Sequence, residues 1–197
     1  MPRFLWIVSV VLSAVVLGAS TAIWATQTLR PTGMVKVGPW EALRAVGDTA
    51  ADPYVHAFIA SSGQLPLGSA EGVRFIAWQT NSGRALVANC SIQVSGTVDV
   101  GRLWTLSITR ADGTAVVLSG TGQAGLHSQD VVYNADGSFD LSIGPTPDAL
   151  NAVLLRSPAQ LSLILSVYDG SISNLAEDSE TALPQLSIDR TRPGCNA

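Results

Sequence analysis

The sequence has few of the residues on which enzyme active sites and nucleic-acid surfaces are usually built. Its 197 residues include two cysteines and two histidines, 13% of residues are charged, and Lys36 is the single lysine. The net charge of −4 and the pI near 5.0 provide no basic surface for the phosphates of nucleic acid or for anionic lipid headgroups. We therefore expect no nucleic-acid partner.

Several motifs of catalytic and metal sites are also missing. The sequence has no G-x-S-x-G for a serine nucleophile, no D-x-D-x-D-G calcium loop, and no glycine-rich loop followed by the lysine of a phosphate site. His56 and His127 both lack the partner spacing of a zinc ligand. The sequence thus predicts no cofactor and no metal ion. An enzymatic function stays uncertain and is less favoured than a non-catalytic one.

A long stretch without charge begins at the N-terminus. Residues 4–25 carry no charged side chain, and as a helix they would extend ~33 Å, enough to cross a hydrocarbon core of ~30 Å. Trp6 and Trp24 lie near its two ends, where membrane interfaces favour aromatic rings. We expect residues 1–27 to be a retained transmembrane anchor. A cleaved signal peptide is the alternative, because Arg3 and the small residues toward the end also fit one.

After the anchor we expect a linker over residues 28–38 and one domain over residues 39–197. In the domain, apolar and polar side chains alternate with a period of two, which is typical of antiparallel strands. Asp-Gly pairs at residues 112–113 and 136–137 predict two hairpins, because glycine readily takes the positive φ of a tight turn. The predicted strands cover residues 72–80, 84–95, 104–109, 114–118, 131–133, 139–143, 160–168 and 183–189. This pattern indicates a mainly β domain, an antiparallel β-sandwich that is jelly-roll-like.

Helical signals are few beyond the N-terminal segment. Asp52 followed by Pro53 is typical of a helix start, and Gly63 of a helix end. We expect one short helix between them, covering one side or end of the sandwich. Residues 41–46 are expected to make one or two helical turns, and the acidic residues 171–181 a surface loop.

The two cysteines, Cys90 and Cys195, are the minimum for one disulfide. Cys90 falls on the apolar face of the predicted strand 84–95, and Cys195 lies in the C-terminal tail. We predict a bridge between them, because the N-terminal segment implies export to an oxidising compartment. The alternative is a buried free thiol at Cys90 and an incidental thiol in the tail.

Four segments carry a resemblance to known proteins. They are ADPYVHAFIASSGQLPL at residues 51–67, RLWTLSITRADG at 102–113, DVVYNADGSFDLSIGPTP at 130–147 and LSLILSVYDG at 161–170. Together they resemble the bacterial domain of unknown function 1214. The resemblance implies a jelly-roll-like sandwich in the bacterial envelope, without an established activity or catalytic residue. Such domains often follow a companion domain (1254) in larger proteins, and they also occur alone behind a membrane segment.

The resemblance has two departures and sets the expected location. Residues 151–154, Asn-Ala-Val-Leu, stand where members commonly have Asn-Trp-Leu-Pro, and the tryptophan usual near the end of the domain is missing. With the anchor, the resemblance implies a single-pass protein of the bacterial inner membrane whose domain lies in the periplasm. The expected partners are the membrane, through the N-terminal helix, and an envelope protein such as one with the companion domain.

The candidate site residues are His127, Asp130 and Tyr133. A histidine and an aspartate at a strand end can form an acid–base pair. More often such a pair is a loop histidine bonded to a backbone group or a carboxylate. The favoured function is therefore a membrane-anchored, non-catalytic binding or accessory module of the envelope. The alternative is an envelope enzyme or small-ligand receptor with these three residues at one end of the sandwich.

Overall fold

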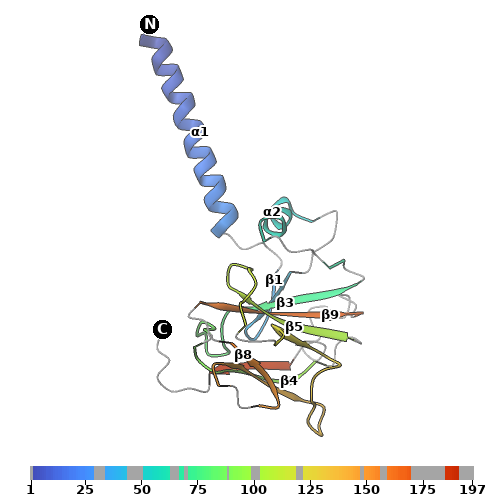
Figure 1. The fold of residues 1–197 in the computed structure, drawn as a ribbon. Coiled ribbons are helices and arrows are strands. Elements are labelled where there is room, and N and C mark those ends of the chain that lie inside the picture. The colour runs from blue at the N-terminus through green and yellow to red at the C-terminus, as the bar shows by residue number, and fades with distance from the viewer. Residues whose placement is uncertain are drawn as a thin grey trace.

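The computed structural model describes residues 2–28, 34–43, 51–62, 67–68, 71–87, 89–98, 103–118, 122–146, 149–155, 159–169 and 185–190. Over these ranges the chain forms an N-terminal helix that projects from a β domain with a second, short helix (Figure 1). The helices are α1 (Pro2–Thr28) and α2 (Pro53–Ser62). The strands are β1 (Met34–Val37), β2 (Trp40–Leu43), β3 (Gly72–Ala77), β4 (Ile92–Thr97), β5 (Leu103–Arg110), β6 (Gly125–His127), β7 (Phe139–Gly144), β8 (Asn151–Leu154), β9 (Leu161–Tyr168) and β10 (Gln185–Arg190).

The strands form two sheets. The larger has the order β1-β2-β3-β9-β5-β6, and the smaller has the order β10-β4-β7-β8. Every pairing is antiparallel except that of β7 with β8, which is parallel. The prediction of a mainly antiparallel β-sandwich with an N-terminal apolar helix is confirmed.

One hydrophobic core lies between the two sheets. Trp104 of β5 stacks on Phe139 of β7, with ring centroids 4.9 Å apart, so these two rings join the sheets directly. Alternate residues of the central strands point into the core, as in β9, where the inward-facing residues are Leu161, Leu163, Leu165 and Val167. Burying each such side chain contributes about 1.5–3 kcal/mol. The period-two pattern therefore decides which face of each strand meets the other sheet.

The short helix α2 begins where the sequence predicts. The carboxylate of Asp52 accepts a hydrogen bond from the backbone N–H of Tyr54 at 2.7 Å, which satisfies one free donor of the first turn. Val55, on the next position, is 1% exposed and turns into the domain. The predicted position of this helix is confirmed.

The chain before α2 differs from its prediction. Residues 40–43 form strand β2, so the helical turns expected over residues 41–46 are wrong for this part, and residues 44–50 lie outside the described residues. Trp40 and Ala42 are both buried while Glu41 faces the other side of the sheet, a period of two that a helix would not satisfy. Met34–Val37, within the expected linker, forms β1 and pairs with β2.

The predicted strand 84–95 is divided between the two sheets. Val87 bridges to Gln160, beside the larger sheet, and β4 then begins at Ile92 in the smaller one. A turn in which the N–H of Cys90 bonds to the carbonyl of Val87 at 3.0 Å redirects the chain between them. Apolar alternation continues through this crossing, because both sheets face the same core.

Both predicted hairpins have one strand and one irregular arm. After the first turn only Ala115 bridges back to β5, at Thr109, because β6 and β9 already occupy the two edges of β5. Before the second turn, residues 131–134 form no strand, since β7 pairs with β4 and with β8 instead. The two turns form where the sequence predicts them. The second strand of each predicted hairpin does not form, because other strands pair with the edges that it would need. The acidic loop expected over residues 171–181 lies outside the described residues.

Candidate site at the edge of the larger sheet

The candidate residues His127, Asp130 and Tyr133 lie at the edge formed by β6. This strand of three residues pairs with β5, and Thr105 is the register partner of His127. Gly125 allows the two strands to meet, because a Cβ at this position would lie 2.2 Å from the backbone oxygen of Leu106. His127 is therefore the last residue of an edge strand, and the turn to Asp130 follows it directly.

His127 and Asp130 close a tight turn directly after β6. The N–H of Asp130 bonds to the carbonyl of His127 at 3.0 Å, and the side chains meet with Nε2 2.5 Å from Oδ2. The side chains of the two residues are 38% and 51% exposed, so the pair is open to solvent. Between them, Ser128 fixes the turn to β5, because its N–H donates to the carbonyl of Trp104 at 3.0 Å.

Tyr133 connects this turn to the core. Its hydroxyl donates a hydrogen bond to the carbonyl of Ser128 at 3.0 Å, and its ring meets Phe139 edge-on with centroids 6.3 Å apart. Phe139 in turn stacks on Trp104. The three candidate residues thus lie around one turn. Tyr133 stabilises this turn through the hydrogen bond from its hydroxyl to the backbone.

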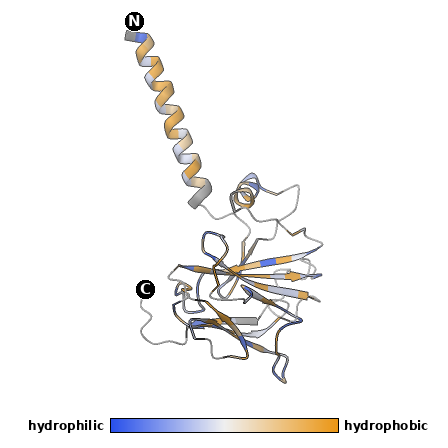
Figure 2. Cartoon of the chain, viewed as in Figure 1, coloured by the Kyte–Doolittle hydropathy of each residue, from blue (hydrophilic) through white to orange (hydrophobic). Residues whose placement is uncertain are grey.

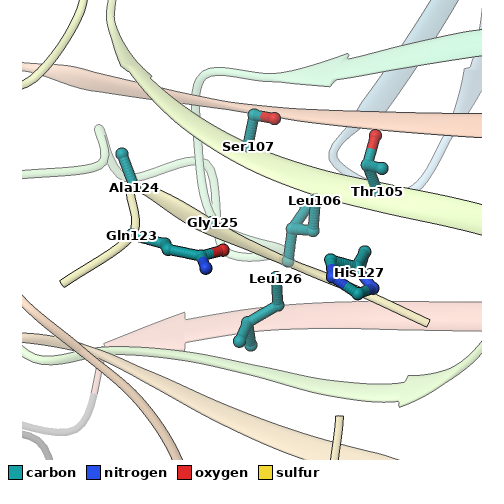
Figure 3. Close-up of a pocket in the computed structure, with 8 residues that line it drawn as sticks. All are labelled: Thr105, Leu106, Ser107, Gln123, Ala124, Gly125, Leu126 and His127. Carbon is teal, nitrogen blue, oxygen red and sulfur yellow. The ribbon is translucent and has the colours of Figure 1, made fainter. Parts of the chain in front are cut away.

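A shallow cavity of about 260 Å³ lies beside the turn. Figure 3 shows its lining residues on β5 and β6 and on the segment that leads into β6. They are Thr105, Leu106, Ser107, Gln123, Ala124, Gly125, Leu126 and His127. The cavity lining therefore includes an imidazole, two hydroxyls and an amide, which are groups that can exchange hydrogen bonds with a small polar ligand.

The described residues do not form a catalytic arrangement around His127. A serine or threonine nucleophile would have to bond to the imidazole, yet the Thr105 hydroxyl lies 3.5 Å from the hydroxyl of Tyr168 instead. Groups of three or more side chains suited to a metal ion are also absent from the described part of the chain. The geometry is that of a turn closed by the contact between the His127 and Asp130 side chains, next to a shallow cavity.

Sequence reasoning identified the His127 turn and missed the other polar groups of the cavity. Thr105 and Ser107 alternate with apolar residues and predict only the polar face of a strand, and Gln123 lies in a glycine-rich segment that carries no binding motif. The available signal was the unusual run of hydroxyls on β5, Thr105, Ser107 and Thr109, beside a glycine-rich segment. Their convergence with His127 depends on the pairing of β5 with β6.

A second surface feature lies along β8, the edge of the smaller sheet. Three apolar side chains, which we call the β8 apolar patch, are solvent-exposed: Val132 at 52%, Leu150 at 83% and Leu154 at 43%. Asn151 holds this edge together. Its side chain accepts from the N–H of Val132 at 2.8 Å and donates to the carbonyls of Val132 and Asp140, each at 2.9 Å.

Helix α1 is mostly apolar on the side that Figure 2 shows, and residues 4–25 carry no charged side chain. Arg3–Ala25 is long and apolar enough to cross a membrane, and no residue of this span is buried inside the rest of the protein. This helix is weakly consistent with a membrane anchor, and a signal sequence near the N-terminus would look the same.

Cys90 is 4% exposed in the core beside β4, as its place on an apolar face predicted. Cys195 lies outside the described residues. The bridge between the two cysteines therefore stays a prediction.

Comparisons with known proteins agree with the fold. No curated protein matches the sequence. The VPA0106 protein from Vibrio parahaemolyticus has a similar fold, with a TM-score of 0.55 and 12% identity over 71% of this chain and 35% of that one. An uncharacterised protein from Burkholderia cenocepacia matches at a TM-score of 0.41 and 18% identity, over 64% of this chain and 32% of that one.

This chain thus spans about a third of the length of the solved structures it matches. The profile of a family described as proteins of unknown function, DUF1214, matches residues 71–171. The matched region runs from β3 through β9 and includes the turn that carries His127. The chain belongs to the DUF1214 family.

Proposed function

We propose that this protein is a single-pass, membrane-anchored binding module of the bacterial envelope, with its β domain on the periplasmic side of the inner membrane. The observation that carries the proposal is the uncovered apolar surface of α1. Apolar surface in water is unfavourable by about 25 cal/mol per Å², and a bilayer removes it from water. The charge of the flanking residues barely selects an orientation, because Arg3 lies on one side and Lys36 on the other.

Reporter fusions to the full chain test the location and the orientation. We expect alkaline phosphatase fused after Ala197 to be active and a green fluorescent protein fused there to stay dark. Carbonate washing should leave the fusion in the membrane fraction. A Val11→Arg/Leu12→Arg variant, changed in the middle of α1, should lose membrane retention. Release of the unaltered protein by carbonate, or a bright fluorescent fusion, would contradict the proposal.

The intact mass of the membrane-bound protein separates an anchor from a signal peptide. The retained anchor requires the mass of the full chain, apart from processing of the first methionine. A mass that lacks the first ~20–30 residues would show cleavage, and the domain would then need another attachment to the envelope.

We also propose the Cys90–Cys195 disulfide, which supports the periplasmic location. Its support is the buried position of Cys90 and the absence of a free cysteine thiol among the described residues. The bridge would close a loop of ~100 residues and contribute up to ~4–5 kcal/mol in the chain-entropy model. Alkylation without reductant, followed by mass mapping, should leave both thiols unlabelled. Labelling of both would reject the bridge and weaken the periplasmic assignment.

We propose that the domain binds a protein partner in the envelope, and a companion-domain (1254) protein is the first candidate. The β8 apolar patch supports this, because exposed apolar side chains grouped at a sheet edge are a usual feature of protein interfaces. The variant Leu150→Asp should reduce recovery of the partner after crosslinking in membranes. The matched control is Val117→Asp, at a residue that is 74% exposed but lies outside the patch. Equal recovery with both variants would exclude the patch.

A small-ligand receptor or enzyme is the second candidate function, and the cavity between β5 and His127 favours it. Amide resonances of Ser107, Gln123 and His127 should shift together when the domain is titrated with a panel of sugars, carboxylates and phosphates. The variant His127→Ala should weaken that response, and the exposed helix residue His56 provides the matched control, His56→Ala. If no compound of the panel moves these resonances, the receptor hypothesis loses its support.

A further inference from the structure

The short segment between α1 and β1 determines which part of the domain lies closest to the proposed anchor. Helix α1 ends at Thr28 and strand β1 begins at Met34. The segment between these residues reaches at most roughly 22 Å when fully extended, at ~3.6 Å per residue. The interfacial layer on one side of a bilayer is itself about 5–8 Å thick. The end of the domain that carries β1 therefore stays near the headgroups.

Helix α2 is at this end of the domain. It contacts α1, and Figure 1 places it beside the C-terminal end of that helix. The opposite edge of the larger sheet is β6, with four strands between β1 and β6. The candidate site beside His127 is thus at the far edge of this sheet from the tether.

The outward surface of α2 suits a lipid interface. The helix contains no Asp, Glu, Lys or Arg, so its insertion among headgroups would bury no charge. Val55 faces the domain, and Tyr54, His56 and Ala60 are exposed. Tyr54 is 61% exposed, and tyrosine is enriched at membrane interfaces because its ring is apolar and its hydroxyl stays hydrated.

A second aromatic residue lies on α1 near the same boundary. Trp24 is 61% exposed and stands at the end of the apolar span. The protein is acidic, and Arg30 and Lys36 are the basic residues within positions 26–43, so the sequence next to α1 has no basic cluster of the kind that binds anionic headgroups. Uncharged, amphipathic side chains such as Tyr54 and Trp24 are then the better candidates for a second contact with the membrane.

We propose that the outward face of α2, with Tyr54 at its start, rests in the lipid headgroup layer and holds the β domain in one orientation on the membrane. This inference rests on the proposed anchoring by α1. A domain with two contacts cannot rotate freely about its linker. Its candidate site then keeps a constant position relative to the membrane.

Photo-crosslinking to lipid tests this contact. The full chain would carry p-benzoylphenylalanine at a single position, Ser13, Tyr54, Ala60 or Val117, in vesicles of phosphatidylcholine with one quarter phosphatidylglycerol. Mass spectrometry after illumination reports lipid adducts. We expect adducts at Ser13, in the middle of α1, and at Tyr54 and Ala60. We expect no adduct at Val117, which is exposed on the β domain outside α2.

The outcomes separate the two proposals. Adducts at Ser13 but not at Tyr54 and Ala60 would overturn the α2 contact and leave the anchor intact. No adduct at Ser13 would overturn the anchor and, with it, the α2 contact. Equal adducts at all four positions, including Val117, would show that the domain has no fixed orientation and would also overturn the α2 contact.

Discussion

At the scale of single residues, two aspartates define the hairpin turns. The Asp136 carboxylate accepts hydrogen bonds from the hydroxyl of Ser138 at 2.6 Å and from its N–H at 3.0 Å. Asp112 makes the same two contacts with Thr114. In both turns these hydrogen bonds, first that from the hydroxyl and then that from the N–H, lower the pKa of the aspartate below its ordinary value of 3.8.

The lowered pKa values predict how stability depends on pH. The charged carboxylate is the bonded form, so its stabilising effect is complete above pH 3.8 and is lost as the pH falls through the lower pKa of the folded state. The variant Asp136→Asn should therefore lose less stability than the unaltered protein when the pH falls below 4. Urea unfolding at several pH values measures this, with Asp189→Asn, exposed on β10, as the control. Identical slopes in the unaltered protein and in Asp136→Asn would contradict the prediction.

Asn151 is a buried polar residue whose removal should cost stability. It is 5% exposed and satisfies three backbone groups, the N–H and carbonyl of Val132 and the carbonyl of Asp140. The variant Asn151→Ala would leave these groups without partners, and we expect it to lower the free energy of unfolding by about 2–4 kcal/mol. Urea denaturation measures the change. Asn134→Ala, at an exposed asparagine of the hairpin, should cost less than about 1 kcal/mol.

At the scale of elements, β6 is the strand on which the candidate site depends. Its three residues pair with β5, and the N–H of Ile108 extends the pairing by bonding to the carbonyl of Ala124 at 2.8 Å. Its presence on β5 excludes the return arm of the first hairpin. One small strand therefore decides both where His127 lies and why residues 114–118 remain irregular.

The variant Gly125→Ala should detach β6 while the rest of the domain stays folded. Its Cβ would collide with the backbone oxygen of Leu106, which cannot move without breaking the sheet. We expect faster hydrogen exchange at the amides of Ile108 and Ser128, and a loss of stability of about 1–3 kcal/mol. Gly122→Ala is the matched control, because its Cβ would lie 3.9 Å from a Leu118 methyl carbon, an ordinary contact. Similar exchange in both variants would refute this role.

At the scale of the whole molecule, the β domain packs its core without side chains from α1. Among residues 3–25, whose burial the structure describes, none belongs to the hydrophobic core, and the large apolar side chains of this stretch are exposed. Folding of the domain therefore should not require the helix. Residues 34–197 alone should be soluble without detergent, give a β-type circular dichroism spectrum and unfold within a few degrees of the full chain in micelles. A domain that aggregates or gives a helical spectrum would contradict this separation.

The strands that pair with a neighbour on both edges were the most predictable part of the fold. For β9 the alternating leucine and valine side chains predicted the inward face, and the predicted range 160–168 agrees with the strand Leu161–Tyr168 to within one residue, because this strand lies between two others in the larger sheet. The edges were less predictable. Strands β1, β6 and β8 are short, and the parallel pairing of β8 with β7 joins segments separated by a loop, which no local pattern records.

The sequence by itself determined an N-terminal helix with an uncharged stretch over residues 4–25, a β domain with two Asp-Gly turns and a lack of catalytic motifs. These features depend on local preferences, such as side-chain alternation, glycine at positive φ and the length of an apolar run. Only the tertiary structure decided which strands share an edge, and thereby that Thr105, Ser107 and Gln123 meet His127 at one cavity. The physical reason is that each strand edge can pair once. Which of the competing segments pairs with a given edge depends on the packing of the whole core between the two sheets.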